Sequence, residues 1–185
     1  MQVLQAGEAC ESRILMKKSD ADKAQFESLL EQHAGIVRKV AFAYARSEND
    51  RRDLTQDILL QLWKAYPRYL PKRPFSTWMY RIALNVAISS LRKRSRPGRE
   101  PVPFDESAHD VPHESGGSSD LEEQIATLHQ LISAYQPLDR GLLLLYLDDC
   151  SYREIAAVLG LSETNVGTKL NRLKQDLRQK LRNKK

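Results

Sequence analysis

The chain has 185 residues, of which 29 are Lys or Arg and 24 are Asp or Glu, so its net charge is +5. This length suits one ordinary domain or two small ones and excludes a large multidomain enzyme. With 41% hydrophobic and 29% charged residues, the composition is that of a folded protein rather than a disordered one. No apolar run approaches the roughly 18 residues of a membrane helix, and residues 1–24 lack the apolar core of an export signal. We therefore expect no membrane span and a cytoplasmic location.

Sequence spacing also argues against catalytic and metal sites. Cys10 and Cys150 lie far apart and outside any ligand pattern, so we predict free thiols rather than a disulfide or a zinc site. His109 and His113 have no third ligand nearby, and no phosphate-binding loop occurs. We expect no metal, no cofactor and no enzymatic activity.

The charge is distributed unevenly, and this divides the chain into segments. Residues 26–96 hold 14 basic and 6 acidic side chains, whereas residues 97–120 carry a net charge of −5 together with four prolines, three glycines and four serines. The second segment has the composition of an extended, solvated linker. We predict an N-terminal extension (1–24), a helical domain (25–96), a flexible acidic linker (97–120) and a second helical domain (121–185). The linker is either a passive tether or a shield for the basic domains.

Apolar residues in the first domain recur every three or four positions, which predicts helices and an all-α fold. Prolines at 67, 71 and 74 predict a loop from 67 to 74, because proline removes a donor and disfavours helix in the preceding residue. The expected apolar runs are Phe26, Leu29, Leu30, Ile36, Val37 and Val40; then Leu54, Ile58 and Leu62; then Trp78, Ile82 and Val86, backed by Met79, Ala83 and Ala87.

The second domain shows several helix-start and helix-stop patterns. Asp120 with Glu123, and Ser151 with Glu154, have the spacing of capping boxes, while Pro137 is expected to start a helix. Gly160 can adopt the left-handed conformation that ends a helix, and Ser162 is expected to cap the next one. The predicted buried residues are Leu121, Ile125, Leu128, Ile132 and Tyr135 in the first helix, and Val166, Leu170, Leu173, Leu177 and Leu181 in the last.

Two capped helices around a glycine turn are the layout of a helix-turn-helix. Helical geometry then directs Glu163, Thr164, Gly167, Thr168 and Asn171 outward, with Lys169 and Arg172 beside them toward phosphates. Residues 169–185 hold eight basic side chains and one acidic one. The alternative is a capped helical hairpin with a solvated basic face.

Two further surfaces are suggested in the first domain. Aromatic residues between 66 and 80 are interleaved with Lys and Arg, the combination that binds single-stranded nucleic acid, and Arg81, Asn85, Ser89, Arg92 and Arg96 form a polar seam. The alternatives are solvated charges at a helix C-terminus and, for some of the rings, Trp78 above all, a core position. Asp53 and Asp57 lie four apart on one helix face, where we expect a protein contact surface rather than a catalytic pair.

Three stretches together closely resemble bacterial RNA polymerase sigma factors of the extracytoplasmic-function (ECF, group IV) type. They are residues 53–63 (DLTQDILLQLW), residues 75–85 (FSTWMYRIALN), and residues 152–156 (YREIA) with Leu159 and Gly160. The resemblance spans about residues 26–96 and 121–182, which cover both domains of that family in order. It implies a sigma region 2 bundle and a sigma region 4 helix-turn-helix.

By this resemblance, the expected partners are core RNA polymerase, through its β′ clamp helices and β flap, and promoter DNA, with an anti-sigma factor as a further candidate and a monomer in the free state. The implied polymerase-binding residues are Asp53, Gln56, Asp57, Leu60 and Gln61. The implied minus-ten residues are Tyr69, Phe75, Trp78, Tyr80, Arg81, Asn85 and Arg92. The implied minus-thirty-five residues are Ser162, Thr164, Asn165, Gly167, Thr168, Lys169, Asn171 and Arg172.

The resulting prediction is a two-domain, all-helical initiation factor that confers promoter specificity and performs no chemistry. The alternative is a free-standing helix-turn-helix regulator, which commonly binds a palindromic operator as a dimer without polymerase. Two glycines depart from expectation: Gly167 replaces a larger polar residue usual in the family, and Gly141 interrupts a supporting helix at a cost of about 1 kcal/mol relative to Ala.

Overall fold

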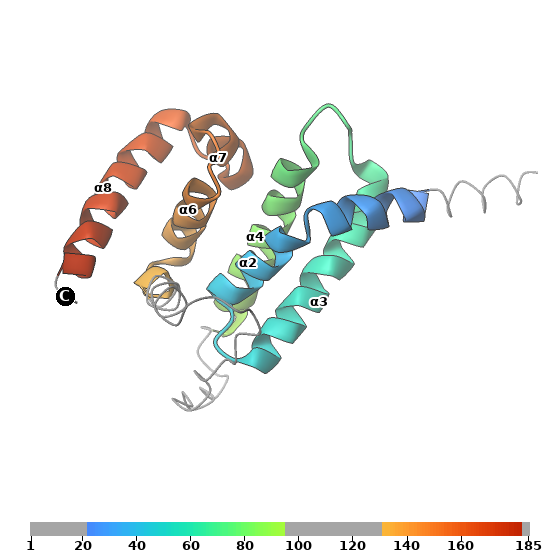
Figure 1. Cartoon of the computed structure of the whole chain (residues 1–185), viewed down its shortest axis with the longest axis horizontal. Helices are drawn as coiled ribbons and strands as arrows, with labels where there is room; N and C mark the ends of the chain where they lie inside the picture. Colours follow the sequence, from blue (N-terminus) through green and yellow to red (C-terminus); the bar gives the residue numbers. More distant parts are fainter. Residues whose placement is uncertain (1–21, 95–130, 183–185) are drawn as a thin grey trace, which may run out of the picture. The chain divides into compact units, whose positions relative to one another are not determined.

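The computed structural model describes residues 22–94 and 131–182, and within these ranges the regular structure is entirely helical, as predicted (Figure 1). The chain separates into two compact units, residues 1–34 and 35–185. In the described part of the first unit, residues 22–32 are helical, Phe26 is buried and Lys23 pairs with Glu27 across one turn at 3.9 Å. The segments discussed below belong to the second unit.

Helix α2 spans Ala34–Tyr44 and buries Ile36, Val37 and Val40, as the apolar spacing predicts. The sequence pattern runs continuously from residue 26 to 40, but the helix does not. A turn at His33, whose N–H donates to the Leu30 carbonyl at 3.2 Å, separates residues 22–32 from α2. The prediction of one continuous run is therefore wrong, since apolar spacing alone does not report a single-residue turn.

Helix α3 spans Glu48–Ala65, and Ser47 caps it by accepting a hydrogen bond from the Asp50 N–H at 3.2 Å. Its buried residues are Leu54, Ile58 and Leu62, which confirms the predicted stripe. Acidic side chains in the first turn and a lysine in the last turn both complement the helix dipole.

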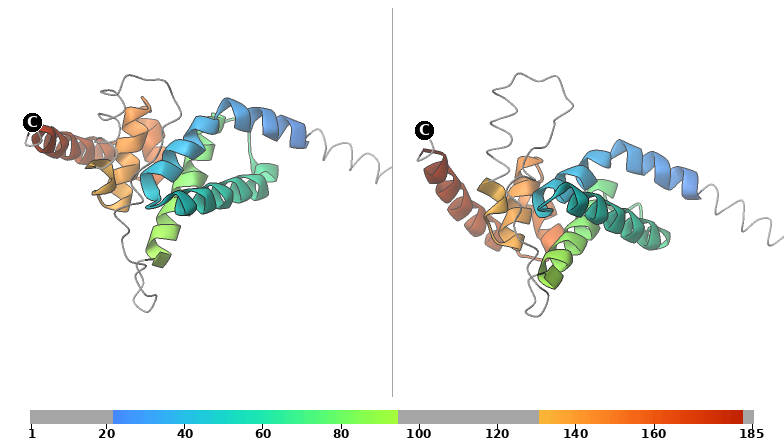
Figure 2. Two further views of the ribbon diagram at one scale, coloured as in Figure 1. Left: turned by 60° about the horizontal axis from the view of Figure 1, so that its bottom comes forward. Right: turned by 90° about the horizontal axis from the view of Figure 1, so that it is seen from below.

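Helix α4 spans Phe75–Arg94 and follows a short 3₁₀ helix, η1, at Tyr66–Arg68. No α-helix spans residues 67–74, as the prolines predict, and α3 and α4 run side by side on either side of this loop (Figures 1 and 2). The buried stripe differs from the prediction, because Trp78, Ile82 and Val86 are only half-buried. The buried side chains are Phe75, Met79, Tyr80, Ala83, Leu84 and Ala87.

Within residues 131–182, a short helical stretch at 131–133 precedes α6 (Pro137–Leu147), α7 (Tyr152–Leu159) and α8 (Glu163–Arg182). Pro137 occupies the first turn of α6, and Gly160 ends α7 with φ at 70°, as predicted. The core of this part consists of the leucines at 142–145 together with Ile155, Val158, Val166, Leu170 and Leu173.

The predicted stripe of α8 does not continue through its C-terminal turns. Leu177 is half-buried and Leu181 is 40% exposed, so these two expectations are wrong. Polar contacts hold this end of the helix instead. Tyr135 donates its hydroxyl hydrogen to Asp176 at 2.5 Å, and the Lys180 ammonium lies 4.2 Å from the centre of the Tyr135 ring.

Several expectations lie outside the described residues: the N-terminal extension, Cys10, the acidic linker with His109 and His113, and most of the helix expected from 121 to 135. Of that helix, residues 131–135 are described: Leu131 and Ile132 are buried as predicted, whereas Tyr135 lies beyond the helical residues 131–133 and is half-buried, so the expectation of a buried Tyr135 is wrong. Across residues 22–94 and 131–182, no helix is both long enough and apolar enough to span a bilayer.

Candidate functional site

The outward face of α3 carries the residues expected to bind polymerase. Because Leu54, Ile58 and Leu62 turn inward, the side chains between them are exposed, with Leu60 at 49%. Acidic, amide and apolar groups therefore share one surface, which is a mixture suited to contact with another protein. The exposed residues are Asp53, Gln56, Asp57, Leu60 and Gln61.

Trp63 belongs to the same face but was absent from the sequence-based set. It is 44% exposed although it is one of the largest apolar side chains, and it lies three residues after Leu60. Large aromatic side chains are enriched at the centres of protein interfaces. The sequence could have identified Trp63, because it follows Leu60 by three residues and therefore lies on the same side of the helix.

The loop between α3 and α4 is braced by an aromatic cluster of Tyr66, Tyr69, Phe75 and Trp78. Tyr66 and Tyr69 stack with an interplanar angle of 16° and ring centres 6.1 Å apart. The Tyr69 ring centre lies 5.3 Å from that of Phe75 and 5.1 Å from that of Trp78. These spacings lie in the range of favourable aromatic pairs, so the rings support one another.

The outer side of this loop is basic. The Tyr69 hydroxyl donates to the Arg73 carbonyl at 2.9 Å, and Arg68, Lys72 and Arg73 are exposed. Leu70 at the loop is 67% exposed and precedes a proline, which restricts it to extended backbone. The loop thus presents cations and one apolar side chain beside half-buried aromatic rings, as expected of a surface for unpaired bases.

The polar seam of α4 lies on the surface at each of its four described members, Arg81, Asn85, Ser89 and Arg92, while Arg96 lies outside the described residues. Arg81, Asn85 and Arg92 are exposed, as a role in DNA contact requires. Phe75 and Tyr80 are 5% and 3% exposed, so neither ring lies open for stacking in this arrangement. The Tyr80 hydroxyl donates to the carboxylate of Asp148, which follows α6. The sequence-based set therefore contains exposed contact residues and two buried rings.

The helix-turn-helix of α7 and α8 is fixed by its caps. Ser151 accepts from the Glu154 N–H at 3.3 Å, and the Glu154 carboxylate accepts from the Ser151 N–H at 2.8 Å, which completes the predicted capping box. Hydrogen bonds from Ser151 hold the pKa of the Glu154 carboxyl below its usual value. This support is therefore present at neutral pH and is lost as falling pH protonates Glu154.

The N-terminal half of α8 presents the predicted polar set. Ser162 caps the helix by accepting from the Asn165 N–H at 3.2 Å. Lys169 is half-buried, and its ammonium lies 3.4 Å from the Asp139 carboxylate in α6, so it is engaged within the fold. The exposed residues are Ser162, Glu163, Thr164, Asn165, Thr168, Asn171 and Arg172.

Gly167 is half-buried, and a methyl group in its place would lie 3.5 Å from the Tyr152 ring, an ordinary contact distance. We expect Gly167→Ala to raise the free energy of unfolding by about 0.5–1 kcal/mol, because glycine loses more backbone freedom in a helix. Gly160→Ala should instead lower it by about 1–2 kcal/mol, since φ there is +70°. Urea unfolding followed by circular dichroism measures both, and shifts of the same sign would contradict this account.

Other groups with reactive potential are inert or scattered. Cys150 is a free cysteine, and burial, followed by the carboxylates of Glu154 and Asp148, raises its pKa to about 11, so the thiol stays protonated at neutral pH. Among the residues that the structure describes, His, Cys, Asp and Glu do not gather in any group able to hold a metal ion.

Comparison with known proteins gives matches to both halves of the chain. Residues 29–97 match the sigma-70 region 2 family, and residues 125–177 match the sigma-70 region 4 family. The RNA polymerase sigma factor CnrH of Cupriavidus metallidurans is 30% identical over 177 residues, which cover 89% of this chain and 91% of CnrH. The ECF RNA polymerase sigma factor SigE of Mycolicibacterium smegmatis is 27% identical, and the match covers 83% of this chain but only 60% of SigE.

Solved structures share the fold. CnrH in complex with the cytosolic domain of CnrY superposes with a TM-score of 0.65 at 22% identity, covering 88% of this chain and 91% of that one. The sigma factor RpoE of Bartonella quintana in complex with the anti-sigma factor NepR gives 0.71 at 20% identity, covering 85% and 97%. The two family matches in order and the full-length similarity to CnrH agree: the chain belongs to the RNA polymerase sigma factors of the extracytoplasmic-function type.

Proposed function

We propose that this sigma factor works as a two-part adaptor, with α3 bound to core RNA polymerase and two separate surfaces bound to promoter DNA. Sigma factors direct core polymerase to promoters, and they are regulatory proteins. One observation supports assigning polymerase binding and DNA binding to different surfaces. A mixed acidic and apolar face on α3 and a capped helix-turn-helix occur in the same chain. The chain itself performs no chemistry and acts in the cytoplasm.

The polymerase-binding surface consists of Asp53, Gln56, Asp57, Leu60 and Gln61, to which we add Trp63. All six side chains are exposed on one side of α3, opposite its buried stripe. The partner there is the β′ clamp helices, while the helix-turn-helix lies by the β flap. The share of apolar surface at Leu60 and Trp63 favours a protein partner over DNA, whose phosphates the neighbouring carboxylates would repel.

The two DNA surfaces differ in the form of DNA that they suit. The loop between α3 and α4, with exposed Arg81, Asn85 and Arg92, binds the melted minus-ten element. The exposed start of α8 enters the major groove of the minus-thirty-five element, where a helix of this kind reaches base edges. Residues 25–96 and 121–185 form the respective domains, joined by the linker at 97–120.

An anti-sigma factor is a further proposed partner. Two sigma factors with this fold, CnrH and the Bartonella RpoE, were solved with the cytosolic domain of CnrY and with NepR. In the absence of partners we expect a monomer, since the exposed apolar residues of α3 are assigned to polymerase.

The test is whether specific DNA binding requires core polymerase. We expect the purified chain alone to bind promoter fragments weakly and without preference, and the chain with core polymerase to select them against competitor DNA. Electrophoretic mobility shifts at fixed salt measure both, because salt alone changes nonspecific affinity. Selective binding of a palindromic site by the chain alone, as a dimer, would instead identify a free-standing regulator.

A further inference from the structure

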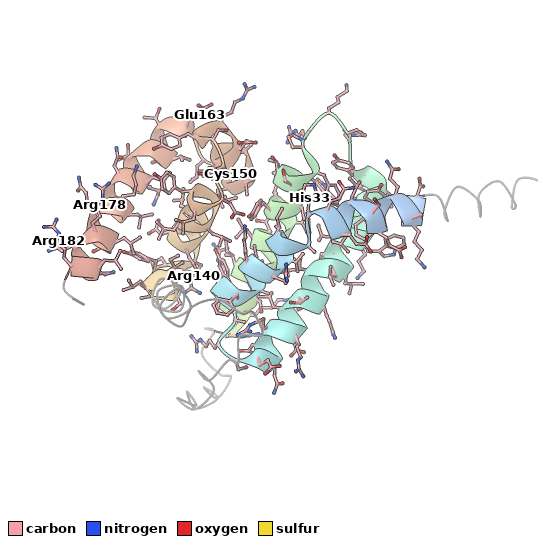
Figure 3. All side chains as sticks on the ribbon, in the orientation of Figure 1. His33, Arg140, Cys150, Glu163, Arg178 and Arg182 are labelled. Carbon is pink, nitrogen blue, oxygen red and sulfur yellow. The ribbon has the colours of Figure 1, made fainter. Side chains whose placement is uncertain are left out.

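The side chain of Leu70, in the loop between α3 and α4, is 67% exposed. Among residues 22–94 and 131–182 it is the most exposed large apolar side chain, followed by Leu60 at 49%. The loop projects beyond α3 and α4 at the top of Figure 1, and Figure 3 shows side chains extending from it into the surrounding space. Single exposed leucines are common on protein surfaces, so a role for this one depends on its surroundings.

A closed turn presents Leu70. The Leu70 carbonyl accepts a hydrogen bond from the Arg73 N–H at 3.4 Å, and the Tyr69 hydroxyl donates to the Arg73 carbonyl at 2.9 Å. Pro71 occupies the second position of this turn, which its fixed φ favours, and it restricts Leu70 to extended backbone. The backbone around Leu70 is thus held from both sides before any partner binds, which lowers the conformational entropy lost on binding.

The charge around the turn indicates the chemistry of its partner. Residues 64–94 contain eight Lys or Arg and no Asp or Glu. Arg68, Lys72 and Arg73, which neighbour Leu70 in the chain, are all exposed. The outward face of α3, in contrast, mixes carboxylates and amides with apolar groups. Cations around one apolar side chain fit DNA, in which phosphates flank the apolar faces of stacked bases.

Leu70 offers something that the aromatic cluster does not. Tyr69 and Trp78 are half-buried and Phe75 is 5% exposed, because these rings pack against one another. A ring that is held by its neighbours can receive a base that is already unpaired, but it cannot enter between two stacked bases. Leucine is one of the apolar side chains that insert between base steps as wedges and unstack them.

We propose that Leu70 is such a wedge, which enters the base stack at the junction between duplex and melted DNA in the minus-ten element. Arg68, Lys72 and Arg73 hold the phosphates on either side of it. The inference rests on the proposed role of this loop in binding minus-ten DNA. It adds a residue outside the set implied by the family resemblance and a separate task, because the wedge favours opening of the stack whereas the rings hold bases that are already open.

Substitutions at Leu70 itself separate the wedge from other effects. Leu70→Ala removes the inserting groups, and Leu70→Asn keeps a branched side chain of similar shape but makes it polar. Leu70→Met keeps an apolar side chain of similar volume, a change that is usually tolerated. Leu147→Ala is the control, since it makes the same truncation at a leucine that is 46% exposed at the end of α6. All four changes are at exposed positions, so the fold should persist.

The experiment uses holoenzyme made from core polymerase and the full chain, on a promoter fragment that this holoenzyme transcribes. 2-Aminopurine in the minus-ten element becomes more fluorescent when it unstacks. We expect Leu70→Ala and Leu70→Asn to slow this fluorescence rise about tenfold, as when about 1.4 kcal/mol of transition-state stabilisation is lost. Leu70→Met and Leu147→Ala should open the promoter at the wild-type rate.

A second set of fragments carries a single abasic site, placed in turn at each position of the minus-ten element. An abasic site interrupts the stack before the protein binds, so it removes the need for a wedge at that step. We expect one of these fragments to restore the opening rate of Leu70→Ala to within about twofold of wild type. The same fragment should accelerate the wild type much less.

Two results would overturn the proposal. Leu70→Ala that opens intact duplex as fast as wild type would show that the side chain has no part in opening. A defect of equal size on the intact duplex and on every abasic fragment, together with weaker binding to core polymerase, would place Leu70 in a protein interface instead. Failure of the proposed function is distinguishable from both, because wild-type holoenzyme would then open no promoter.

Discussion

Reversing the charge of both Asp53 and Asp57 to Lys is expected to weaken binding to core polymerase at least tenfold, which corresponds to about 1.4 kcal/mol. Both carboxylates are exposed on α3, four residues apart and opposite the stripe of Leu54, Ile58 and Leu62. Placing like charges across an interface costs several kcal/mol in favourable geometries, whereas the same change on a solvated surface costs little. The fold should survive, because neither carboxylate supports the core.

The matched control is Glu27→Lys with Glu31→Lys, which makes the same change in net charge at the same spacing on another helix. Both control residues are exposed. Biolayer interferometry with immobilised core polymerase measures the two dissociation constants. If the two double variants lose affinity equally, the effect is one of total charge, and the assignment of α3 as the docking surface is wrong.

The second large effect separates the two DNA surfaces by the form of DNA that each meets. Asn171 is exposed near the start of α8, and asparagine can make paired hydrogen bonds to adenine in the major groove, worth about 1–3 kcal/mol of discrimination. We expect Asn171→Ala to lower run-off transcription about 5- to 150-fold at promoters with a duplex upstream element. A pre-melted bubble at minus ten should not restore it.

Thr168 should matter less than Asn171. Its hydroxyl already donates to the Thr164 carbonyl at 3.0 Å, so that hydrogen is not available to a base. This difference between two exposed residues follows from the structure and could not be read from helical spacing. Thr168→Ala, measured in the same assay, is expected to lose less activity than Asn171→Ala.

Variants of the loop surface should respond in the opposite way to a bubble. Tyr69→Leu keeps apolar bulk against Phe75 and Trp78 but removes the ring that can stack on an unpaired base, an interaction worth about 1–3 kcal/mol per base. We expect a strong defect on duplex templates and substantial recovery on bubble templates, since the bubble removes the cost of unstacking. Equal recovery of Tyr69→Leu and Asn171→Ala would contradict the assignment of different DNA forms to the two surfaces.

Local patterns in the sequence were sufficient for most helix boundaries. The capping box of Ser151 and Glu154, the proline at 137 and the glycine at 160 act within one helical turn, so their meaning does not depend on distant parts of the chain. The same holds for the stripe of α3. Its three buried residues have solvent-exposed neighbours on the other side, which gives a clear period.

Contacts between residues far apart in the sequence could not be predicted from local patterns. The sequence pattern groups Tyr80 with residues expected to face melted DNA, whereas in the structure its ring is buried and its hydroxyl donates to Asp148, 68 residues later. The pattern suggests a phosphate contact for Lys169, whose ammonium in the structure lies 3.4 Å from the Asp139 carboxylate, 30 positions earlier. In the sequence, Gly141 only interrupts a helix. In the structure, a methyl group at this position would lie 3.0 Å from the Tyr44 hydroxyl oxygen. In each case the other residue lies at least 30 positions away in the sequence, so the spacing of apolar residues cannot reveal it.

The most direct measurement of the central claim is transcription in vitro from a genomic DNA library, with transcript 5′ ends mapped by sequencing. The account predicts discrete start sites, preceded by shared elements near minus ten and minus thirty-five, only when core polymerase and this chain are both present. The Asp53→Lys, Asp57→Lys variant should lose these sites, and the Glu27→Lys, Glu31→Lys variant should keep them. Start sites that do not change when the wild-type chain is added would contradict the account.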